Sequence, residues 1–391
     1  MKRWILVLLL FGGNAFSQNI KIGELNSYKV FPAFLEPYRK GWELAVEEIN
    51  AAGGVLGRKL EVVSRDDGGT PGDAVRVAEE LIVREKADLL MGTFASNVGL
   101  AVANLAHQRR IMFLAAEPLT DKIVWENGNR YTFRLRPSTY MQTAMLIPEA
   151  AKLKKKRWAI VYPNYEYGQS ATASFKRLLK QAQPDAEFVA EQAPALGKIE
   201  AGAVVQALID ARPDAIFSSL FAADLQKFVR EGNTRGLFRN VTVFNLLAGE
   251  PEYLDTLKDE TPDGWWVTGY PWSAIQTSEH RRFRDAYQKR WQDYPRQGSV
   301  VGYTAVYTVA EAMKRSGSVD TEKLIAAMKG LKMQTPFGPI TWRTLDNQST
   351  MGAYVGRLSN KGGQGVMSGW RYADGALFQP SDEEVNGLRK E

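Results

Sequence analysis

The sequence alternates between two hydrophobic patterns, and this alternation limits the folds that the chain can adopt. Residues 20–25 form a short apolar run typical of a strand, whereas residues 38–49 repeat apolar side chains with helical spacing and end before Gly53. The same alternation continues with strand patterns at 60–64, 88–91 and 111–114 and helical patterns at 71–84 and 97–108. Such alternation is typical of parallel sheets covered by crossover helices, so we expect an α/β fold.

A second series of the same kind follows residues 133–137. Its strand patterns lie at 158–162, 186–190, 215–218 and 241–244, again separated by helical patterns. A chain of 391 residues is long enough for two domains, so we expect two doubly wound lobes. Residues 278–291 and 299–314 are helical in pattern, whereas 337–370 is rich in glycine and short strands. This last part is too small for a domain of its own, so it should complete the two lobes.

The first residues have the pattern of a secretory signal peptide. Lys2 and Arg3 precede the apolar run 4–11, and residues 15–17 offer small side chains for cleavage before Gln18. A retained membrane anchor is the alternative, but it needs roughly 20 apolar residues. The chain has no cysteine, which excludes disulfides and a lipid on an N-terminal cysteine. We therefore expect residues 1–17 to be removed and the mature protein to be periplasmic, without membrane insertion and not a lipoprotein.

The net charge of +6 raises the question of nucleic-acid binding. Basic and acidic residues are interspersed, and the one compact basic run is 152–157. This run precedes an apolar segment, so it is better explained as the end of a helix, where cations are favoured, and the start of a strand. We expect no nucleic-acid partner.

Enzyme motifs are almost absent. The two histidines, His107 and His280, lie far apart without a neighbouring acidic cluster, and no phosphate-binding glycine motif joins a strand to a helix. Residues 362–365 fit a hairpin turn better than a phosphate cradle. We therefore expect no catalytic residue, metal or cofactor, and no enzymatic activity.

Small polar and aromatic residues gather at the ends of the predicted strands, where open α/β sheets bind ligands. In segment 92–97, Ser96 is a candidate N-cap, and the free amides of the helix that follows would suit a carboxylate. A plain helix cap is the alternative. Together with other residues at strand ends, this segment would line a cleft with aromatic surface and a few polar anchors. The further candidates are Phe94 and Asn97 of the same segment and Ser27, Tyr28, Ala115, Ala116, Glu117, Tyr165, Tyr167, Phe221, Leu247 and Tyr270.

The sequence resembles the type I periplasmic solute-binding proteins of the branched-chain (hydrophobic) amino-acid ABC importers, the leucine-isoleucine-valine-binding group. The most characteristic stretch is residues 47–59, EEINAAGGVLGRK. Further matching motifs lie along nearly the whole mature chain, at 22–23, 66–67, Pro71, Ala74, Ser96, 167–168, 264–267 and 337–342.

This resemblance implies two lobes joined by three crossover segments, near 136–139, 269–272 and 334–337. Lobe 1 would then combine residues 18–137 with 271–335, and lobe 2 would combine 138–270 with 336–391. The ligand is expected between the lobes, which close on it in the manner of a Venus flytrap.

The resemblance also implies roles within the site. Ser96, the Asn97 amide and the segment Ala115–Ala116 resemble the family's carboxylate site, and Tyr167 and Phe221 resemble its aromatic wall. Members that bind amino acids place an acidic residue where this chain has Leu247. Glu250 or Glu117 could replace that acid, because a buried ammonium needs a carboxylate partner.

The implied function is therefore that of a periplasmic carrier. Its expected ligand is a branched-chain or hydrophobic amino acid, or a related aromatic or aliphatic carboxylate. Its expected partner is an inner-membrane ABC permease, to which it delivers the ligand. A free periplasmic sensor with the same fold is the alternative.

Overall fold

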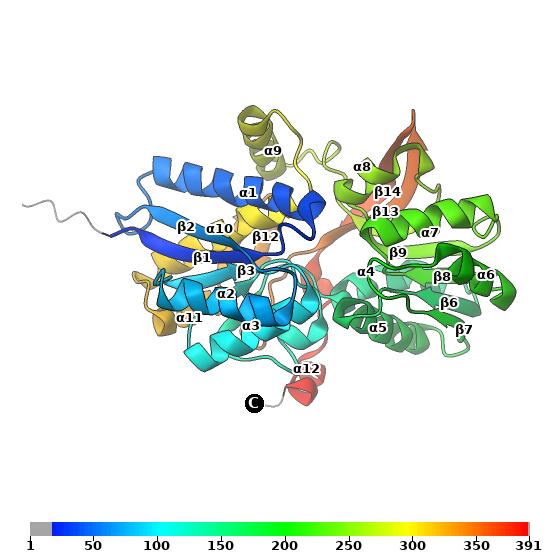
Figure 1. Cartoon of the computed structure of the whole chain (residues 1–391), viewed down its shortest axis with the longest axis horizontal. Coiled ribbons are helices and arrows are strands. Elements are labelled where there is room, and N and C mark those ends of the chain that lie inside the picture. The colour runs from blue at the N-terminus through cyan, green and yellow to red at the C-terminus, as the bar shows by residue number, and fades with distance from the viewer. Residues whose placement is uncertain (1–17, 390–391) are drawn as a thin grey trace, which may run out of the picture.

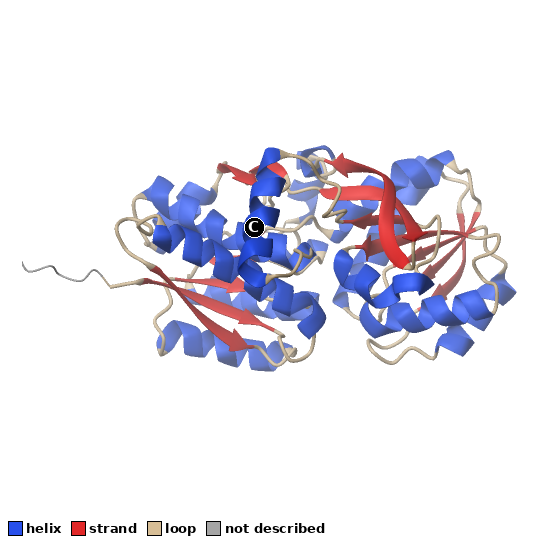
Figure 2. Ribbon diagram, turned by 90° about the horizontal axis from the view of Figure 1, so that it is seen from above, coloured by secondary structure: helices blue, strands red, loops and turns tan. Residues whose placement is uncertain are grey.

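The computed structural model describes residues 18–389. The expected signal peptide, residues 1–17, lies outside the described residues. Within them the chain forms two α/β lobes that lie side by side, each with a sheet between layers of helices (Figures 1 and 2). The predicted fold class is confirmed.

The sheet of lobe 1 has the strand order β2-β1-β3-β4-β5, and all of its neighbouring strands are parallel. Its strands are β1 (Ile20–Asn26), β2 (Leu60–Asp66), β3 (Leu89–Gly92), β4 (Phe113–Ala115) and β5 (Thr132–Arg134). The helices that alternate with the first strands are α1 (Pro32–Ala51), α2 (Pro71–Val83) and α3 (Ser96–Arg109), and the turn η1 (Asp121–Ile123) follows β4. The order places the long strand β1 at the centre of the early strands, where its apolar side chains are buried on both faces.

Lobe 2 contains a seven-stranded sheet with the order β14-β13-β10-β9-β8-β6-β7. Its parallel strands are β6 (Arg157–Val161), β7 (Glu187–Gln192), β8 (Ala215–Ser218), β9 (Thr242–Gly249) and β10 (Trp266–Gly269). Its helices are α4 (Thr139–Lys152), α5 (Glu166–Ala182), α6 (Ala201–Ala211), α7 (Ala222–Thr234) and α8 (Pro251–Leu257), with the turn η2 (Lys258–Glu260) after them. The basic run 152–157 joins the end of α4 to the start of β6, as predicted.

The remaining chain completes both lobes. Lobe 1 receives α9 (Ser278–Trp291), α10 (Gln297–Ser316), α11 (Thr321–Met328) and the hairpin of β11 (Lys332–Thr335) and β12 (Gly338–Thr341). Lobe 2 receives the antiparallel strands β13 (Ala353–Lys361) and β14 (Gln364–Ala373), whose turn at 362–363 lies within the predicted 362–365. The turn η3 (Gly375–Leu377) and α12 (Asp382–Leu388) end the described chain.

Helices α1 and α10 pack closely, and this contact fixes the edge of lobe 1 that faces lobe 2. A Cβ atom on Gly41 would lie 2.1 Å from the Ser299 carbonyl oxygen, and one on Gly302 would lie 2.2 Å from that of Tyr38. Only glycine allows the two backbones to approach this far. The contact brings the first turns of α1 and α10 to the boundary between the lobes (Figure 1).

The third connection between the lobes lies later in the chain than the expected 334–337. The β11–β12 hairpin stays with lobe 1, because the ring of Trp342 packs beside that of Phe133, with 6.1 Å between centroids. Asn347 then donates a hydrogen bond to the Thr132 carbonyl, 3.1 Å away. The chain therefore passes to lobe 2 between residue 349, which contacts β5, and β13. The expected boundary at 335/336 is corrected accordingly.

Candidate functional site

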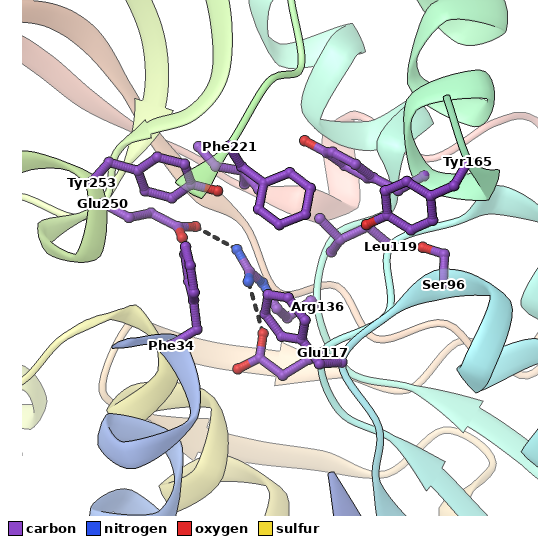
Figure 3. Close-up of a pocket in the computed structure, with 12 residues that line it drawn as sticks. Phe34, Ser96, Glu117, Leu119, Arg136, Tyr165, Phe221, Glu250 and Tyr253 are labelled. Atoms are coloured by element: carbon purple, nitrogen blue, oxygen red, sulfur yellow. Dashed lines mark hydrogen bonds and ion pairs between the residues drawn. The ribbon is translucent and has the colours of Figure 1, made fainter. Parts of the chain in front are cut away.

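A cavity lies between the lobes, at the carboxyl ends of strands from both sheets. About 360 Å³ of space not filled by protein atoms lies among its walls, and part of this space is open to solvent. This position is the usual ligand site of open α/β sheets. Its walls, drawn in Figure 3, are formed by Phe34, Phe94, Ser96, Glu117, Leu119, Arg136, Tyr165, Tyr167, Phe221, Leu247, Glu250 and Tyr253.

Phe221 is at the centre of the aromatic wall. It is the N-cap residue of α7, with an extended backbone, and its ring lies in the cavity wall (Figure 3). The ring centroid lies between 5.9 and 6.4 Å from those of five others, which are Phe31, Phe34 and Phe94 of lobe 1 and Tyr165 and Tyr167 of lobe 2. Aromatic pairs at this spacing attract one another, so Phe221 links the aromatic side chains of the two lobes.

The lobe 1 side of the cavity contains the N-terminus of α3. Ala95, and not Ser96, is the N-cap residue, so the prediction that Ser96 caps this helix is wrong. Ser96 is instead the first helical residue, and its Oγ accepts a hydrogen bond of 3.2 Å from the Thr120 backbone N–H. Because Ala95 has no side-chain acceptor, no side chain caps the first-turn amides. The helix dipole therefore favours an anion at this end of the cavity.

A buried group of charges lies at the boundary between the lobes. Arg136, from the first crossover segment, donates to Glu117 Oε2 at 2.8 Å and also to Glu250 Oε1 (Figure 3). Glu117 follows β4 of lobe 1, whereas Glu250 is the N-cap residue of α8 in lobe 2. The Glu117–Arg136–Glu250 triad therefore connects both lobes through one guanidinium group.

The triad has unusual proton affinities because its members are buried. Burial raises the pKa of Glu250 to about 8, although Arg136 opposes this shift. Burial also raises the pKa of Glu117, again against the effect of Arg136. The two carboxylates in turn raise the pKa of Arg136, so the guanidinium stays charged. The cavity thus offers both a cation and carboxyl groups beside an apolar interior.

Leu247 lies at the end of β9 in the left-handed region, with a φ of 71°. Its backbone N–H donates to Thr268 Oγ1 at 2.9 Å, and its side chain lines the cavity. This conformation is uncommon for a branched side chain and is typical of functional sites. Leu247 contributes an apolar surface, and the nearby acid on this side of the cavity is Glu250.

Comparison with known proteins connects this architecture to a family. Residues 20–364 match the family described as periplasmic binding protein. The chain belongs to this family. The predicted resemblance is thereby confirmed, and because such proteins bind and do not transform their solutes, this periplasmic binding protein is not an enzyme.

Individual relatives of this periplasmic binding protein cover nearly its whole length. The Leu/Ile/Val-binding protein homolog 7 of Brucella suis is 24% identical over 387 residues, which cover 94% of this chain and 93% of the relative. A solute-binding protein of an ABC transporter from Rhodopseudomonas palustris BisB5, solved with 3,4-dihydroxybenzoic acid, is 25% identical with a TM-score of 0.81, and the match covers 91% and 98% of the two chains.

A third relative shows that the same fold occurs with a different solute. The branched-chain amino-acid transporter substrate-binding protein LivJ from Streptococcus pneumoniae, solved with isoleucine, is 20% identical with a TM-score of 0.79. The match covers 91% of this chain and 99% of that chain.

The cavity of this binding protein unites eight of the predicted site residues, most of them predicted from strand ends. They come from both lobes and are Phe94, Ser96, Glu117, Tyr165, Tyr167, Phe221, Leu247 and Glu250. Among them the Tyr167 hydroxyl is buried without a hydrogen-bond partner within residues 18–389. A buried hydroxyl in a cavity wall is available to a ligand.

Other predicted residues take part in the structure of lobe 1 and do not line the cavity. Ser27 donates to Asp67 Oδ1 at 2.7 Å, and the Tyr28 hydroxyl accepts from Trp42 Nε1 at 3.1 Å. The Ala116 N–H donates to the Gly92 carbonyl at 3.0 Å, so this amide already has a partner. Ala115 pairs in β4, and Asn97 lies on a partly exposed face of α3.

Tyr270 was also predicted for the site but does not line the cavity. Its hydroxyl is 2.6 Å from His280 Nε2, and burial lowers the pKa of His280 to about 4. Its ring packs against Phe337, with 5.2 Å between centroids. Tyr270 and His280 therefore hold the second connection between the lobes, and His280 has a structural role.

Four residues of the cavity were not predicted from the sequence. They are Phe34, Leu119, Arg136 and Tyr253. The position of Arg136 in a crossover segment could have predicted its place in the site, since a charged side chain there must lie near the boundary between the lobes. Phe34 and Tyr253 lie on the helices α1 and α8, and the sequence of a helix does not separate a cavity side chain from a core side chain.

The described part of the chain has two further properties that bear on function. Between residues 18 and 389, no three His, Asp or Glu side chains are grouped so that they could hold a metal ion. No helix in the same range is long and apolar enough to cross a bilayer.

Proposed function

We propose that this chain is the solute-binding component of an ABC importer and that it binds a small carboxylate with a hydrophobic, aromatic or branched body. The observation that supports this proposal is the cavity itself, which has an aromatic wall and different polar groups on its two sides. Such a composition suits a small amphipathic solute. The proposed location is the periplasm, after removal of residues 1–17, and the proposed partner is an inner-membrane permease.

The carboxylate of the ligand belongs at the N-terminus of α3. The uncapped amides and the helix dipole supply a site for negative charge, and Ser96 lies in the cavity wall beside them. The body of the ligand then lies against Phe221 and Tyr167. Burial of a ring or a branched side chain there contributes roughly 1.5–3 kcal/mol.

The opposite side of the cavity accepts a second polar group. Glu250 supplies the carboxyl group that Leu247 lacks, so an ammonium group has a partner, and an amino acid fits the site. The same carboxyl groups and the Tyr167 hydroxyl also bond to a hydroxyl group on an aromatic acid. Solutes of both kinds occur in the relatives described above, and both belong to the proposed ligand class.

A ligand panel tests this function. We expect a member of the panel to raise the melting temperature in proportion to the logarithm of its excess over Kd. At a hundredfold excess, the free energy of unfolding should increase by about 2.7 kcal/mol. The panel consists of L-leucine, L-isoleucine, L-phenylalanine, benzoate, 4-hydroxybenzoate and 3,4-dihydroxybenzoate. Native mass spectrometry of the purified protein adds any solute that is already bound. If no carboxylate shifts the transition or is found bound, the proposed ligand class is wrong.

The Ser96→Ala variant tests the carboxylate site. We expect binding of the best panel member to weaken by about 1–3 kcal/mol, because the hydroxyl and its bond to Thr120 order this end of the cavity. Calorimetry at 25 °C, where both proteins are folded, gives the difference. Ser381→Ala is the matched control, because it removes the N-cap of the remote helix α12 and should leave affinity unchanged. Equal affinity in Ser96→Ala would show that the carboxylate binds elsewhere.

A further inference from the structure

Three carboxyl groups are buried where the lobes meet, but only one cation lies among them. Glu117, Glu250 and Glu252 are each no more than 4% exposed. Arg136 contacts Glu117 and Glu250 and does not contact Glu252. If all three acids were ionised, this boundary would bury a net charge of −2. Burial of uncompensated charge is costly, and buried acids usually respond by taking up protons.

Glu252 is the carboxyl group that depends most directly on the contact between the lobes. It lies on α8 of lobe 2, and its oxygens accept hydrogen bonds from the first amides of α10 in lobe 1. Its Oε1 accepts from the Gly298 N–H at 2.9 Å and its Oε2 from the Gln297 N–H at 3.2 Å. Because donor and acceptor belong to different lobes, separation of the lobes breaks both bonds and returns Glu252 to water.

Within residues 18–389, no lysine, arginine or histidine forms an ion pair with Glu252. Glu117 raises the pKa of Glu252, and Glu252 in turn raises the pKa of Glu250. The other titratable groups that interact with Glu252 are Tyr253, Tyr270 and Tyr287. Arg296, which precedes α10, donates instead to Asp255 on α8 at 2.8 Å and to Asp293 at 2.9 Å. A negative charge on Glu252 is stabilised by the N-terminus of α10, by its two amides and by the backbone N–H of Glu252 itself.

We propose that closure of the two lobes takes up protons at this cluster of buried carboxyl groups, so that mild acidity favours the closed state even without a ligand. The cluster would then couple the conformation of the binding protein to the pH of its compartment. Glu252 has the clearest role in this coupling, because it lies outside the ligand cavity.

The direction of the coupling follows from the proton affinities. In the described arrangement, in which the lobes are in contact, burial raises the pKa of Glu252 from an ordinary 4.5 to about 7 and that of Glu250 to about 8. A group with a higher pKa in the closed state favours closure below its ordinary pKa, and this contribution is lost as the pH rises through 7. Glu252 alone changes the closed-to-open ratio by about tenfold between pH 8 and pH 6.

The test follows the distance between the lobes in the ligand-free protein. The chain has no cysteine, so Glu36→Cys on α1 and Lys227→Cys on α7 provide two exposed labelling sites, one on each lobe. Single-molecule energy transfer between pH-insensitive dyes then gives the closed fraction from pH 8 to pH 6. Glu252→Gln is the test variant, because its neutral amide keeps the shape and one acceptor oxygen. Glu260→Gln is the control, because Glu260 pairs with Arg230 within lobe 2.

We expect the closed-to-open ratio of the parent protein to rise by about tenfold or more between pH 8 and pH 6. Glu252→Gln should be more closed than the parent at pH 8 and should respond less to pH, whereas Glu260→Gln should follow the parent. A parent protein that stays open throughout, or closes less at low pH, overturns the proposal. A Glu252→Gln curve identical to that of the parent also overturns it. Since no ligand is present, neither result depends on the proposed ligand class.

Discussion

Replacement of Arg136 by methionine should weaken binding of the best panel ligand by about 3–5 kcal/mol, which is the usual cost of removing one partner from a buried ion pair. Glu117 and Glu250 would then remain buried in the closed state without a cation. In an open state both acids return to water, so the cost falls mainly on closure and less on folding. Calorimetry gives the affinity, and thermal unfolding of the empty protein shows how much of the loss is structural.

Two comparisons make this expectation specific. The loss in Arg136→Met should be larger at pH 8 than at pH 6, because protonation of the two acids removes the uncompensated charge. The triple variant Arg136→Met, Glu117→Gln and Glu250→Gln should regain part of the affinity for a ligand without an amine. Arg157→Met, which changes an exposed arginine of lobe 2, is the control. Unchanged affinity in Arg136→Met would mean that the triad does not support closure.

The arrangement of the lobes could be predicted from the sequence because each strand and helix has its own periodicity. The run at 20–25 became β1, and the helical pattern at 38–49 lies within α1. The predicted boundary between the lobes at 335/336 was wrong for a different reason. The strands of the β11–β12 hairpin have no pattern that says which lobe they join, and that choice depends on the contact of Trp342 with Phe133.

The candidate site was predictable where a residue directly follows a strand. Phe221 and Glu117 were found in this way, since the ends of parallel strands meet at one edge of a sheet. Tyr28 and Tyr270 also follow strands, but each hydroxyl has a structural partner, Trp42 and His280 respectively. Sequence position alone does not distinguish a tyrosine that faces the cavity from one that faces such a partner.

The structure changes how Leu247 should be interpreted. From the sequence, Leu247 was a reason to doubt that an amino acid could bind, because it stands where an acid was expected. In the folded chain Glu250 lies in the same cavity wall, and Arg136 donates to its Oε1. The cavity therefore holds a guanidinium between two acids, and we expect the proton affinity of Glu250 to affect the ligand that it prefers.

Replacement of Phe221 by alanine should weaken ligand binding by about 3–5 kcal/mol, the usual cost of removing a phenylalanine ring from a packed interior. The ring packs against Phe31, Phe34 and Phe94 of lobe 1, so its loss weakens the contact between the lobes as well as the contact with the ligand. Phe221→Leu should lose less, because it keeps part of the buried apolar area. Phe238→Ala is the control, since this ring packs on Trp265 within lobe 2, and its loss should lower stability without changing affinity. If Phe221→Ala binds the best panel ligand as tightly as the parent protein, the aromatic wall does not form the binding surface.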